Sequence, residues 1–386
     1  MVINKKNWKK VCFGDLVYEK KLSVDAESCG LGRYVAGDHM TTEDLHLRKW
    51  GLVGDGYLGP AFHRKFESGD ILYGSRRTYL KKVAVADFDG ITSNTTFVIT
   101  EDTGKVVAGL LPFLMLSDRF TEHSVKNSKG SVNPYINFKD IAKFEFLLPP
   151  KDQQARLAEL LWAADEVVQK YDDLKKSQIL TLNSFFDIVY KEKSLKYLSL
   201  GQCLEFSQYG ISEQLSDVGD IPVLRMNNLQ NKKVVMYDLK YILRSTIKNP
   251  ESLLLKKGDI LFNRTNSYEL VGKVGLFDLE KEVTFASYLI RLRANVEIVL
   301  PEYLNSYLNS EKGQAAIRVH RTPGVSQSNI NVENLKKITI PIVSKNVQLE
   351  LIKKLALLES AMQETEAAIK SVLTIQKQLI NKIFSA

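Results

Sequence analysis

The sequence predicts a mixed α/β (α+β) protein built from two similar domains, separated by two long helices that pair as an antiparallel coiled coil. Apolar residues recur at alternating steps of three and four in two stretches without Pro or Gly, which is typical of a coiled-coil seam. Short strand and turn motifs of the first half return, in the same order, in the second half. We therefore expect an internal duplication with a pseudo-two-fold axis, in which one chain imitates a symmetric dimer.

Length and composition fit this arrangement and restrict the class of protein. The 386 residues suffice for two domains and two helices, and the 44% hydrophobic content is typical of a globular chain. The net charge of +8 favours a polyanionic partner such as nucleic acid. The sequence has no run of 18 apolar residues and no N-terminal apolar signal core, so we expect a cytoplasmic protein without a membrane span. Its three cysteines show no metal-ligand spacing.

The first domain is expected over residues 1–150. Its clearest motif is the turn Gly69-Asp70, which is followed by β-branched and aromatic residues that predict a strand. Its last strand shows strict alternation of apolar residues, as does the matching strand of the second half. The residues predicted to face inward in these two strands are Phe144, Phe146, Leu148, Ile338, Ile340 and Ile342.

A long spacer helix is expected over residues 151–190, and a second one over residues 346–386. A helix of roughly 36 residues rises about 54 Å, which exceeds the width of a small domain. Much of each helix must therefore pack outside its own domain, and the other helix is the obvious partner. The seam between them is predicted to consist of Leu157, Leu160, Val167, Leu174, Leu351, Leu355, Leu358, Met362, Ile369, Val372 and Leu379.

The second domain, expected over residues 191–345, repeats the landmarks of the first. Gly258-Asp259 follows Gly69-Asp70 by 189 residues, and Ile330-Asn331 follows Ile136-Asn137 by 194 residues. This small drift indicates the same fold with short loop insertions. The unit is too long for a solenoid repeat of about 20–50 residues, so the pattern indicates a tandem duplication.

Polar loops between these landmarks differ between the two halves. They carry the donors and acceptors that contact phosphates and base edges in DNA, and unlike clusters at matched places indicate two heads that read two different targets. In the first domain the predicted DNA contacts are Arg76, Arg77, Tyr79, Lys81, Lys82, Lys126, Lys129, Asn133 and Tyr135. In the second domain they are Asn263, Arg264, Thr265, Asn266, Lys273, Arg318, His320, Arg321, Ser326 and Gln327.

The sequence offers little to support catalysis. It has no Gly-x-x-x-x-Gly-Lys-Ser/Thr phosphate loop, no His-Glu-x-x-His motif and no Cys/His cluster, so it predicts neither ATP hydrolysis nor a metal site. Asn133-Pro134-Tyr135 approaches the Asn/Asp-Pro-Pro-Tyr/Phe motif of amino-methyltransferases but lacks the second proline. We interpret it as a loop turn and predict no catalytic residue.

With these motifs the chain resembles the specificity (S) subunits of type I restriction-modification enzymes over essentially its whole length. The resemblance also covers Asn94, which we add to the predicted DNA contacts. The segments that carry it are residues 69–79, 94–97, 136–137, 148–154, 258–261 and 330–331. The segment before the second helix, residues 340–348, departs from the Pro-Pro and acidic-Gln pattern found before the first.

The resemblance implies two target recognition domains, each reading one half of a split DNA site, and spacer helices that set the distance between them. It also implies methyltransferase (M) subunits, two in number, that bind S-adenosylmethionine and dock on the charged outer faces of the helices. Restriction (R) subunits would hydrolyse ATP with Mg²⁺ and cut DNA. The S subunit itself is then a non-catalytic part of a host-defence system and needs no cofactor.

Two alternatives stay open at this point. The chain could be a DNA adenine methyltransferase or nuclease in its own right, which S-adenosylmethionine binding by the isolated chain would favour. It could also be a two-headed scaffold that binds proteins, in which case its positive charge is incidental. A steep fall of DNA affinity with salt would separate DNA recognition from protein binding, because phosphate contacts release counterions.

Overall fold

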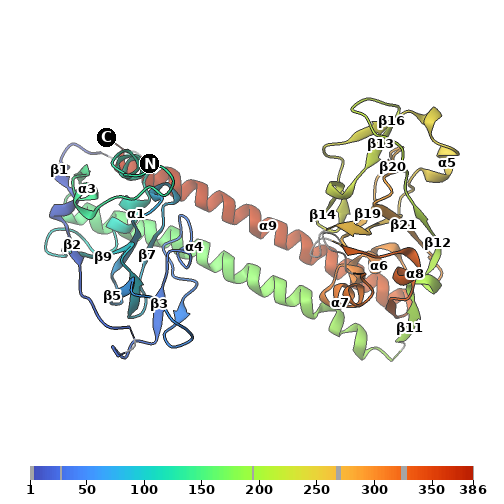
Figure 1. Ribbon diagram of the computed structural model, residues 1–386, viewed down its shortest axis with the longest axis horizontal. Helices are drawn as coiled ribbons and strands as arrows, with labels where there is room; N and C mark the ends of the chain where they lie inside the picture. The colour runs from blue at the N-terminus through green and yellow to red at the C-terminus, as the bar shows by residue number, and fades with distance from the viewer. Residues whose placement is uncertain (1–3, 27, 194, 267–270, 323–327, 386) are drawn as a thin grey trace. The chain divides into compact units, whose positions relative to one another are not determined.

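The computed structural model describes residues 4–26, 28–193, 195–266, 271–322 and 328–385, which fall into two compact units (Figure 1). Unit 1 comprises Met1–Asp173 and Glu366–Ala386, and unit 2 comprises Leu174–Thr365. The two long helices, α4 (Lys151–Ser184) and α9 (Lys345–Phe384), each contribute a segment to both units. The predicted fold class, two α/β domains with two long antiparallel helices, is confirmed.

Unit 1 contains two four-stranded sheets, ordered β2-β9-β6-β7 and β4-β3-β8-β5, and an antiparallel pair formed by β1 and β10. Its strands are β1 (Lys9–Cys12), β2 (Val17–Lys20), β3 (Arg33–Val35), β4 (Gly51–Leu52), β5 (Phe62–Phe66), β6 (Ile71–Gly74), β7 (Val83–Val85), β8 (Gly90–Ser93), β9 (Thr96–Glu101) and β10 (Glu145–Leu148). Its short helices are α1 (Leu111–Leu116), α2 (Asp118–Lys126) and α3 (Phe138–Ile141).

Unit 2 repeats this plan with a six-stranded sheet, β12-β21-β17-β19-β15-β14, a three-stranded sheet, β16-β13-β20, and the pairs β11-β23 and β18-β22. Its strands are β11 (Lys196–Ser199), β12 (Leu204–Tyr209), β13 (Ile221–Leu224), β14 (Leu229–Gln230), β15 (Lys233–Val234), β16 (Lys240–Ile242), β17 (Ile260–Asn263), β18 (Thr265–Asn266), β19 (Val274–Leu276), β20 (Thr284–Phe285), β21 (Leu289–Ala294), β22 (Ser328–Asn329) and β23 (Thr339–Ile342). Its short helices are α5 (Pro250–Leu253), α6 (Pro301–Leu308), α7 (Glu311–Val319) and α8 (Val332–Lys336).

The Gly-Asp turns perform the same structural task in both units. Gly69 and Gly258 adopt φ values of 93° and 91°, which other residues rarely adopt. The carboxylates that follow, Asp70 and Asp259, are buried and accept a backbone hydrogen bond from three residues earlier, at 2.8 and 2.7 Å. The predicted inward residues of β10 and β23, together with Phe144 just before β10 and Ile338 just before β23, are buried as expected. The duplication seen in the sequence is thus a duplication of structure.

A buried glutamine ties each long helix to the domain before it. Gln154 in α4 accepts from Val107 N–H at 2.8 Å, and Gln348 in α9 accepts from Leu300 N–H at 2.9 Å. Each side chain also donates to the carbonyl five residues earlier, at 2.8 and 2.9 Å. The departure in sequence before the second helix therefore leaves this contact intact, and Ser344 still caps α9 through Val347 N–H.

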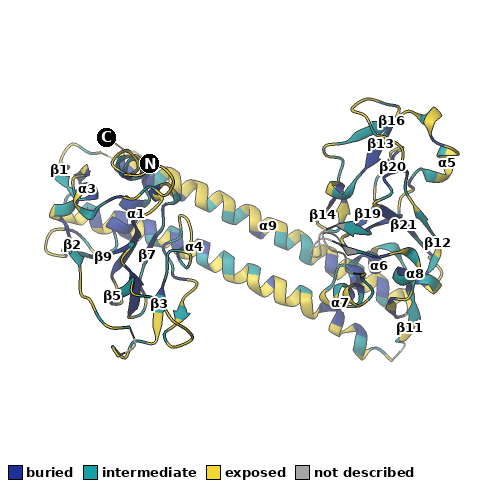
Figure 2. Ribbon diagram, in the orientation of Figure 1, coloured by how far each residue is buried: buried dark blue, intermediate teal, exposed yellow. Residues whose placement is uncertain are grey.

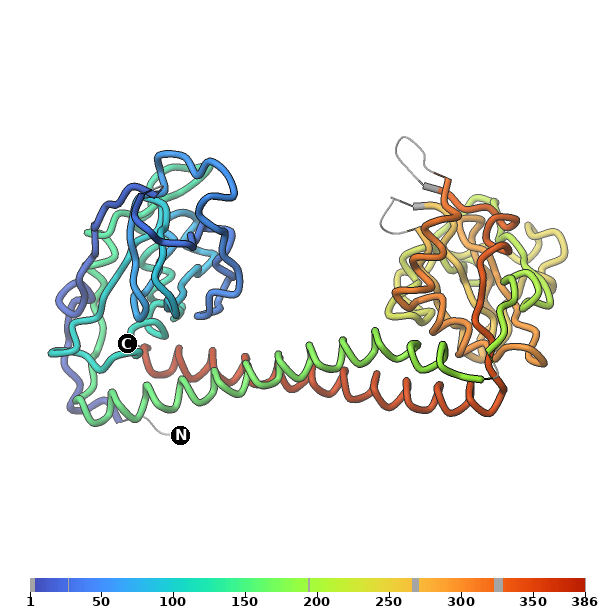
Figure 3. The backbone as a smooth tube through the Cα atoms, turned by 90° about the horizontal axis from the view of Figure 1, so that it is seen from below, coloured from blue at the N-terminus to red at the C-terminus, as the bar shows by residue number. Residues whose placement is uncertain are grey.

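In each unit a segment of α4 lies beside a segment of α9, and the two run antiparallel (Figure 3). Gln178 Nε2 donates to Thr365 Oγ1 across them at 3.1 Å. None of the seven predicted seam residues of α9 is exposed: they are Leu351, Leu355, Leu358, Met362, Ile369, Val372 and Leu379.

The predicted seam of α4 is wrong by one position along most of its length. Leu157 is buried, but Leu160, Val167 and Leu174 are 40%, 40% and 46% exposed. Buried and exposed positions alternate along α4 (Figure 2), and polar side chains are among the buried ones. The buried positions of α4 are Gln154, Leu157, Ala158, Leu161, Asp165, Val168 and Gln178.

Candidate nucleic-acid interface

Two loops of unit 1 that lie far apart in the sequence come together at the end of β6. Arg76 and Tyr135 form an antiparallel bridge, and Tyr135 forms a second bridge with Lys129. The Arg77 N–H also donates to Pro134 O at 2.7 Å. These backbone contacts hold the turn after β6 and the loop after α2 in one arrangement, as a polar recognition surface requires.

The turn after β6 is unusual in its backbone. Arg77 and Lys81 have φ values of 48° and 46°, in the left-handed region, on either side of a 3₁₀ turn at Thr78–Leu80. Residues other than glycine adopt this conformation only when their surroundings hold it, and such residues cluster at binding sites. The turn presents Tyr79, whose side chain is 54% exposed.

Most of the residues predicted to contact DNA in the first domain do lie on the surface. The turn before β9 adjoins the same loops, because Ser75 N–H donates to Thr95 O at 2.9 Å. The exposed predicted residues are Arg76, Arg77, Tyr79, Asn94, Lys126, Lys129, Asn133 and Tyr135. Four of these eight are cations, which suits a surface that faces phosphates.

The prediction that Lys81 and Lys82 contact DNA is wrong. Lys81 is buried, and its ammonium pairs with Asp118 at 2.5 Å and with Glu43 at 3.2 Å. Lys82 is half-buried and donates to Gly37 O. Both side chains turn inward and stabilise the fold, because their charges and donors are satisfied within unit 1.

Unit 2 builds the same framework from different residues. Thr265 pairs with Asn329 in the β18-β22 ribbon, and Asn329 forms a second bridge with Thr322. Ile330 N–H donates to Arg264 O at 3.0 Å. The strand end after β17 and the loop before α8 are therefore joined as their counterparts are in unit 1.

Arg264 has an aromatic partner that sequence reasoning missed. Its guanidinium lies 4.8 Å from the ring centre of Tyr209, at the end of β12. The hydroxyl of Tyr209 in turn accepts from Val332 N–H at 3.1 Å. A cation held over an aromatic ring loses rotamer freedom before it meets a ligand. The pairing depends on strand register across 55 positions, and no local motif signals it.

The other residues predicted in the second domain divide into three groups. Lys273 and Arg318 are exposed, and His320, at the end of α7, is half-buried, as are Arg264 and Thr265. Asn263 is buried in β17 and is therefore a wrong prediction, and the half-buried Arg321 donates to Val271 O within the unit. Two further residues, Ser326 and Gln327, and the side chain of Asn266 lie outside the described part of the chain.

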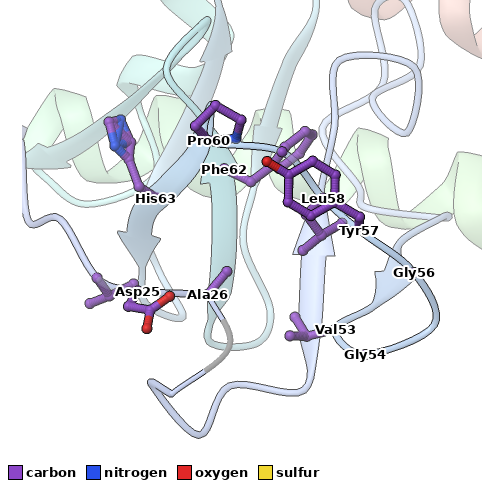
Figure 4. Close-up of a pocket in the computed structure, with 12 residues that line it drawn as sticks. Asp25, Ala26, Val53, Gly54, Gly56, Tyr57, Leu58, Pro60, Phe62 and His63 are labelled. Carbon is purple, nitrogen blue, oxygen red and sulfur yellow. The ribbon is translucent and has the colours of Figure 1, made fainter.

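Unit 1 also has a hollow of about 690 Å³ beside the loop at residues 53–60 (Figure 4). Tyr57, Leu58 and Phe62 supply most of its apolar wall, and Asp25 and His63 supply polar groups. Ala61, between the lining residues Pro60 and Phe62, accepts through its carbonyl from Asn94 N–H at 2.9 Å. None of the predicted DNA contacts lines the hollow.

The chain is similar to proteins of a known family. Residues 195–374 match a family model described as Type I restriction modification DNA specificity domain. This part of the chain is similar to a type I DNA specificity domain. The domain spans the second α/β domain and most of α9, and the match confirms the family resemblance read from the sequence.

Curated relatives of this specificity domain have the same character. A putative type I restriction enzyme MjaX specificity subunit of Methanocaldococcus jannaschii is 25% identical over 51% of this chain and 49% of its own length. The EcoDI specificity subunit of Escherichia coli is 30% identical over 32% of this chain and 30% of its own length. The matched segments thus span about half or less of these relatives. Specificity subunits are a non-catalytic, DNA-recognising class of protein.

Solved structures extend the likeness in fold to the whole chain. A structure described as the basis of complex assembly and conformational transition of the type I R-M system matches with a TM-score of 0.62, at 16% identity, over 98% of this chain and 97% of its own. The S subunit from M. genitalium matches with a TM-score of 0.53, at 16% identity, over 100% and 98%. Unit 1 therefore has the fold of a specificity subunit although the family model stops short of it.

The specificity domain and unit 1 present different side chains at equivalent backbone positions. Ser75 and Arg264 occupy equivalent positions in the two copies. The carbonyl of Ser75 accepts from Ile136 N–H, and the carbonyl of Arg264 accepts from Ile330 N–H. By their β-bridges, Arg76 is equivalent to Thr265 in the other copy, and Tyr135 is equivalent to Asn329. Framework is shared while the chemistry of the exposed groups changes.

The described residues of the two units lack two features, a metal-binding cluster and a membrane-spanning helix. The described residues include no group of three or more His, Cys, Asp or Glu side chains placed to hold a metal ion. No helix within the described ranges combines the length and the apolar character needed to cross a bilayer. Burial raises the pKa of the Cys203 thiol to about 11, which makes it unreactive.

Proposed function

We propose that the chain is the DNA-recognition subunit of a type I restriction-modification complex, and that each unit reads one half of a bipartite DNA site. The observation that carries this proposal is the shared backbone framework of the two loop clusters with different side chains upon it. A pair of identical readers would require identical side chains at these positions, and a purely structural repeat would not require the exposed cations.

In unit 1 we assign base or phosphate contact to Arg76, Arg77 and Tyr79, on the strained turn. Lys126 and Lys129 lie on the second loop and suit phosphates, since an ammonium is a point charge without bidentate geometry. In unit 2 we assign the corresponding roles to Arg264, held by its aromatic partner, and to the exposed Lys273 and Arg318. Arginine that pairs with guanine gives the most discriminating of these contacts.

For the helices we propose two tasks. The first is to set the distance between the two half-sites. The second is to bind partner subunits through the outer face of α4, where Leu160, Val167 and Leu174 recur every seven residues and are exposed. This heptad stripe suits a helix of a methyltransferase subunit, of which we propose two. S-adenosylmethionine would then bind to the M subunits, and ATP with Mg²⁺ to the R subunits, in the cytoplasm.

The test is the double variant Arg76→Ala, Arg77→Ala, assayed with an M subunit by sequencing the methylated sites in random DNA. If the two arginines contact bases, each substitution weakens the first half-site by about 1–3 kcal/mol and relaxes its sequence while the second half-site stays unchanged. If they contact phosphates, affinity falls on all sequences and the salt slope decreases by about one per residue.

Lys105→Ala is a matched control, because Lys105 is an exposed cation of unit 1 that pairs with Asp102. It should leave DNA affinity and methylated sites unchanged. DNA binding without salt dependence, or a double variant whose methylated sites and DNA affinity are both unaltered, would contradict the proposal and favour a protein-binding scaffold. Methylation by the chain without an M subunit would instead identify a methyltransferase.

A further inference from the structure

A polar pocket of about 420 Å³ lies on unit 2 between β12, β21 and the segment around α5. Phe206, Lys256, Arg291 and Arg293 all line it. The pocket is at the start of β17, next to Asp259, whereas the candidate DNA surface follows the other end of that strand. It is therefore a separate feature of the unit.

The pocket holds more positive than negative charge. Arg293 forms a bidentate pair with the buried Asp259, with both N···O distances 2.8 Å, and Arg291 lies 3.8 Å from the same carboxylate. Glu251 also lines the pocket but pairs with Arg244 on its outer side. Lys256 is exposed and has no carboxylate within ion-pair distance in the described ranges. Three cations, Lys256, Arg291 and Arg293, thus line the pocket, and both nearby carboxylates are already paired with an arginine.

Arg291 is a buried cation of the pocket, and one of its terminal nitrogens donates to Gln208 Oε1. Its side chain is 4% exposed, and its two terminal nitrogens donate to the carbonyls of Leu254 and Ser252 at 2.8 Å. Its Nε, also buried, finds no acceptor among the described residues. Burial lowers the pKa of Arg291, with a further contribution from the charge of Arg293. A buried guanidinium next to a second cation is stabilised when an anion binds beside it.

The equivalent place in unit 1 has a different balance of charge. There Asp70 accepts from Thr100 Oγ1 at 2.6 Å, in the role that Arg293 has towards Asp259. Glu67 occupies the position of Lys256, since each of these residues donates its backbone N–H to the buried aspartate. A single lysine, Lys20, bridges the two carboxylates at 2.9 Å. Glu67 also pairs with Lys65 at 3.0 Å, so two lysines balance two carboxylates in unit 1, whereas three cations line the pocket of unit 2.

We propose that the pocket of unit 2 binds a single phosphate group, held by Lys256 and Arg293 beside the ring of Phe206. The guanidinium of Arg293 lies 4.8 Å from that ring and that of Arg291 lies 4.9 Å from it, so both cations are fixed in place. Nη1 of Arg293 forms no hydrogen bond to a described residue and remains available to an oxyanion. The group belongs either to inorganic phosphate or to the backbone of bound DNA.

The experiment compares the full chain with Lys256→Glu, which installs the acidic residue of unit 1, and with Lys257→Ala as a control. Lys257 is the neighbouring exposed lysine, but it pairs with Asp278 at 3.1 Å and does not line the pocket. Calorimetric titration with sodium phosphate at constant ionic strength should give equal affinities for wild type and Lys257→Ala. The affinity of Lys256→Glu for phosphate should be at least roughly tenfold lower, because a charge-assisted contact is lost.

A salt titration of DNA binding with the same three proteins identifies the source of the phosphate. If the group belongs to DNA, Lys256→Glu reduces the salt slope by about one relative to the control. If it is free phosphate, DNA binding stays unchanged while the calorimetric difference persists. Equal behaviour of all three proteins in both assays would overturn the proposal. The calorimetric arm contains no DNA, so its result is independent of the proposed DNA recognition.

Discussion

Single basic residues in the two loop clusters have very different surroundings, although they look alike in the sequence. Arg76 and Arg77 are exposed on a strained turn, whereas Lys81, four residues later, is buried against two carboxylates. Local sequence predicts that a cation is present but cannot identify its partner, because Asp118 and Glu43 approach from other elements. The role of each basic residue in such a cluster therefore depends on contacts that become known only from the fold.

Replacing Lys81 by methionine should destabilise unit 1 without a specific effect on DNA contacts. The substitution removes the ion pairs with Asp118 and Glu43 and should lower the free energy of unfolding by about 1–3 kcal/mol. Chemical denaturation of the full chain measures this loss. Lys126→Ala, at an exposed site, should change stability by less than about 0.5 kcal/mol, and similar losses for both variants would contradict the structural role of Lys81.

A histidine links unit 1 to its own segment of α4 and should make that contact depend on pH. His46 Nε2 lies 2.6 Å from Asp165 Oδ2, and this hydrogen bond raises the pKa of His46 above its ordinary value near 6.5. The stabilisation is fully present below the pKa of the unfolded state and is lost as the pH rises through the higher folded value.

The free energy of unfolding of the wild type should accordingly fall, relative to that of His46→Gln, as the pH rises above the ordinary histidine pKa of about 6.5. The difference should be below about 1 kcal/mol, because His46 is partly exposed and water screens the pair. Denaturation at several pH values measures it. A constant difference between the two proteins at these pH values would show that protonation of His46 does not contribute.

At the scale of elements, the long helices were predictable in place and extent but not in orientation. Helix propensity and the absence of Pro and Gly located both helices, and α9 follows its apolar pattern. In α4 the seam includes Asp165 and Gln178, whose partners, His46 and Thr365, come from distant parts of the chain. Apolar periodicity alone therefore selected an exposed face of α4.

Two adjacent leucines of α4 provide a direct test of this assignment. Leu161→Ala should cost about 2–5 kcal/mol of stability, because the side chain is fully buried in the core of unit 1. Leu160→Ala should change stability by less than about 0.5 kcal/mol but weaken binding of an M subunit, since this leucine is exposed. Thermal unfolding and a pull-down with the M subunit separate the two effects, and a reversed order of stability would restore the predicted seam.

At the scale of the whole molecule, the duplication was the most reliable inference from sequence. Repeated landmarks such as Gly69-Asp70 and Gly258-Asp259 mark positions where the backbone allows few substitutions, so they persist in both copies. Loop conformations, the Arg264–Tyr209 pairing and the different balance of charge around Asp259 could not be predicted, because they depend on residues brought together by the sheet.

If α4 and α9 set the spacing as proposed, lengthening both should lengthen the unread gap in the DNA site. Four residues inserted near Lys175 in α4 and near Ala368 in α9, positions next to the Gln178–Thr365 contact, add about 6 Å. At about 3.4 Å per base pair this equals one to two base pairs. Sequencing of methylated sites measures the gap. Insertion of four residues into the exposed loop at residues 102–105 is the control, and an unchanged gap in the helix variant would exclude the ruler.

The outward leucine and valine stripe of α4 has a practical consequence for handling the protein. A line of apolar side chains in contact with water promotes self-association when nothing covers it. Preparations of the chain produced alone should form soluble aggregates that disperse on addition of a mild detergent. Co-expression with the subunit that covers the stripe should instead yield a monodisperse sample.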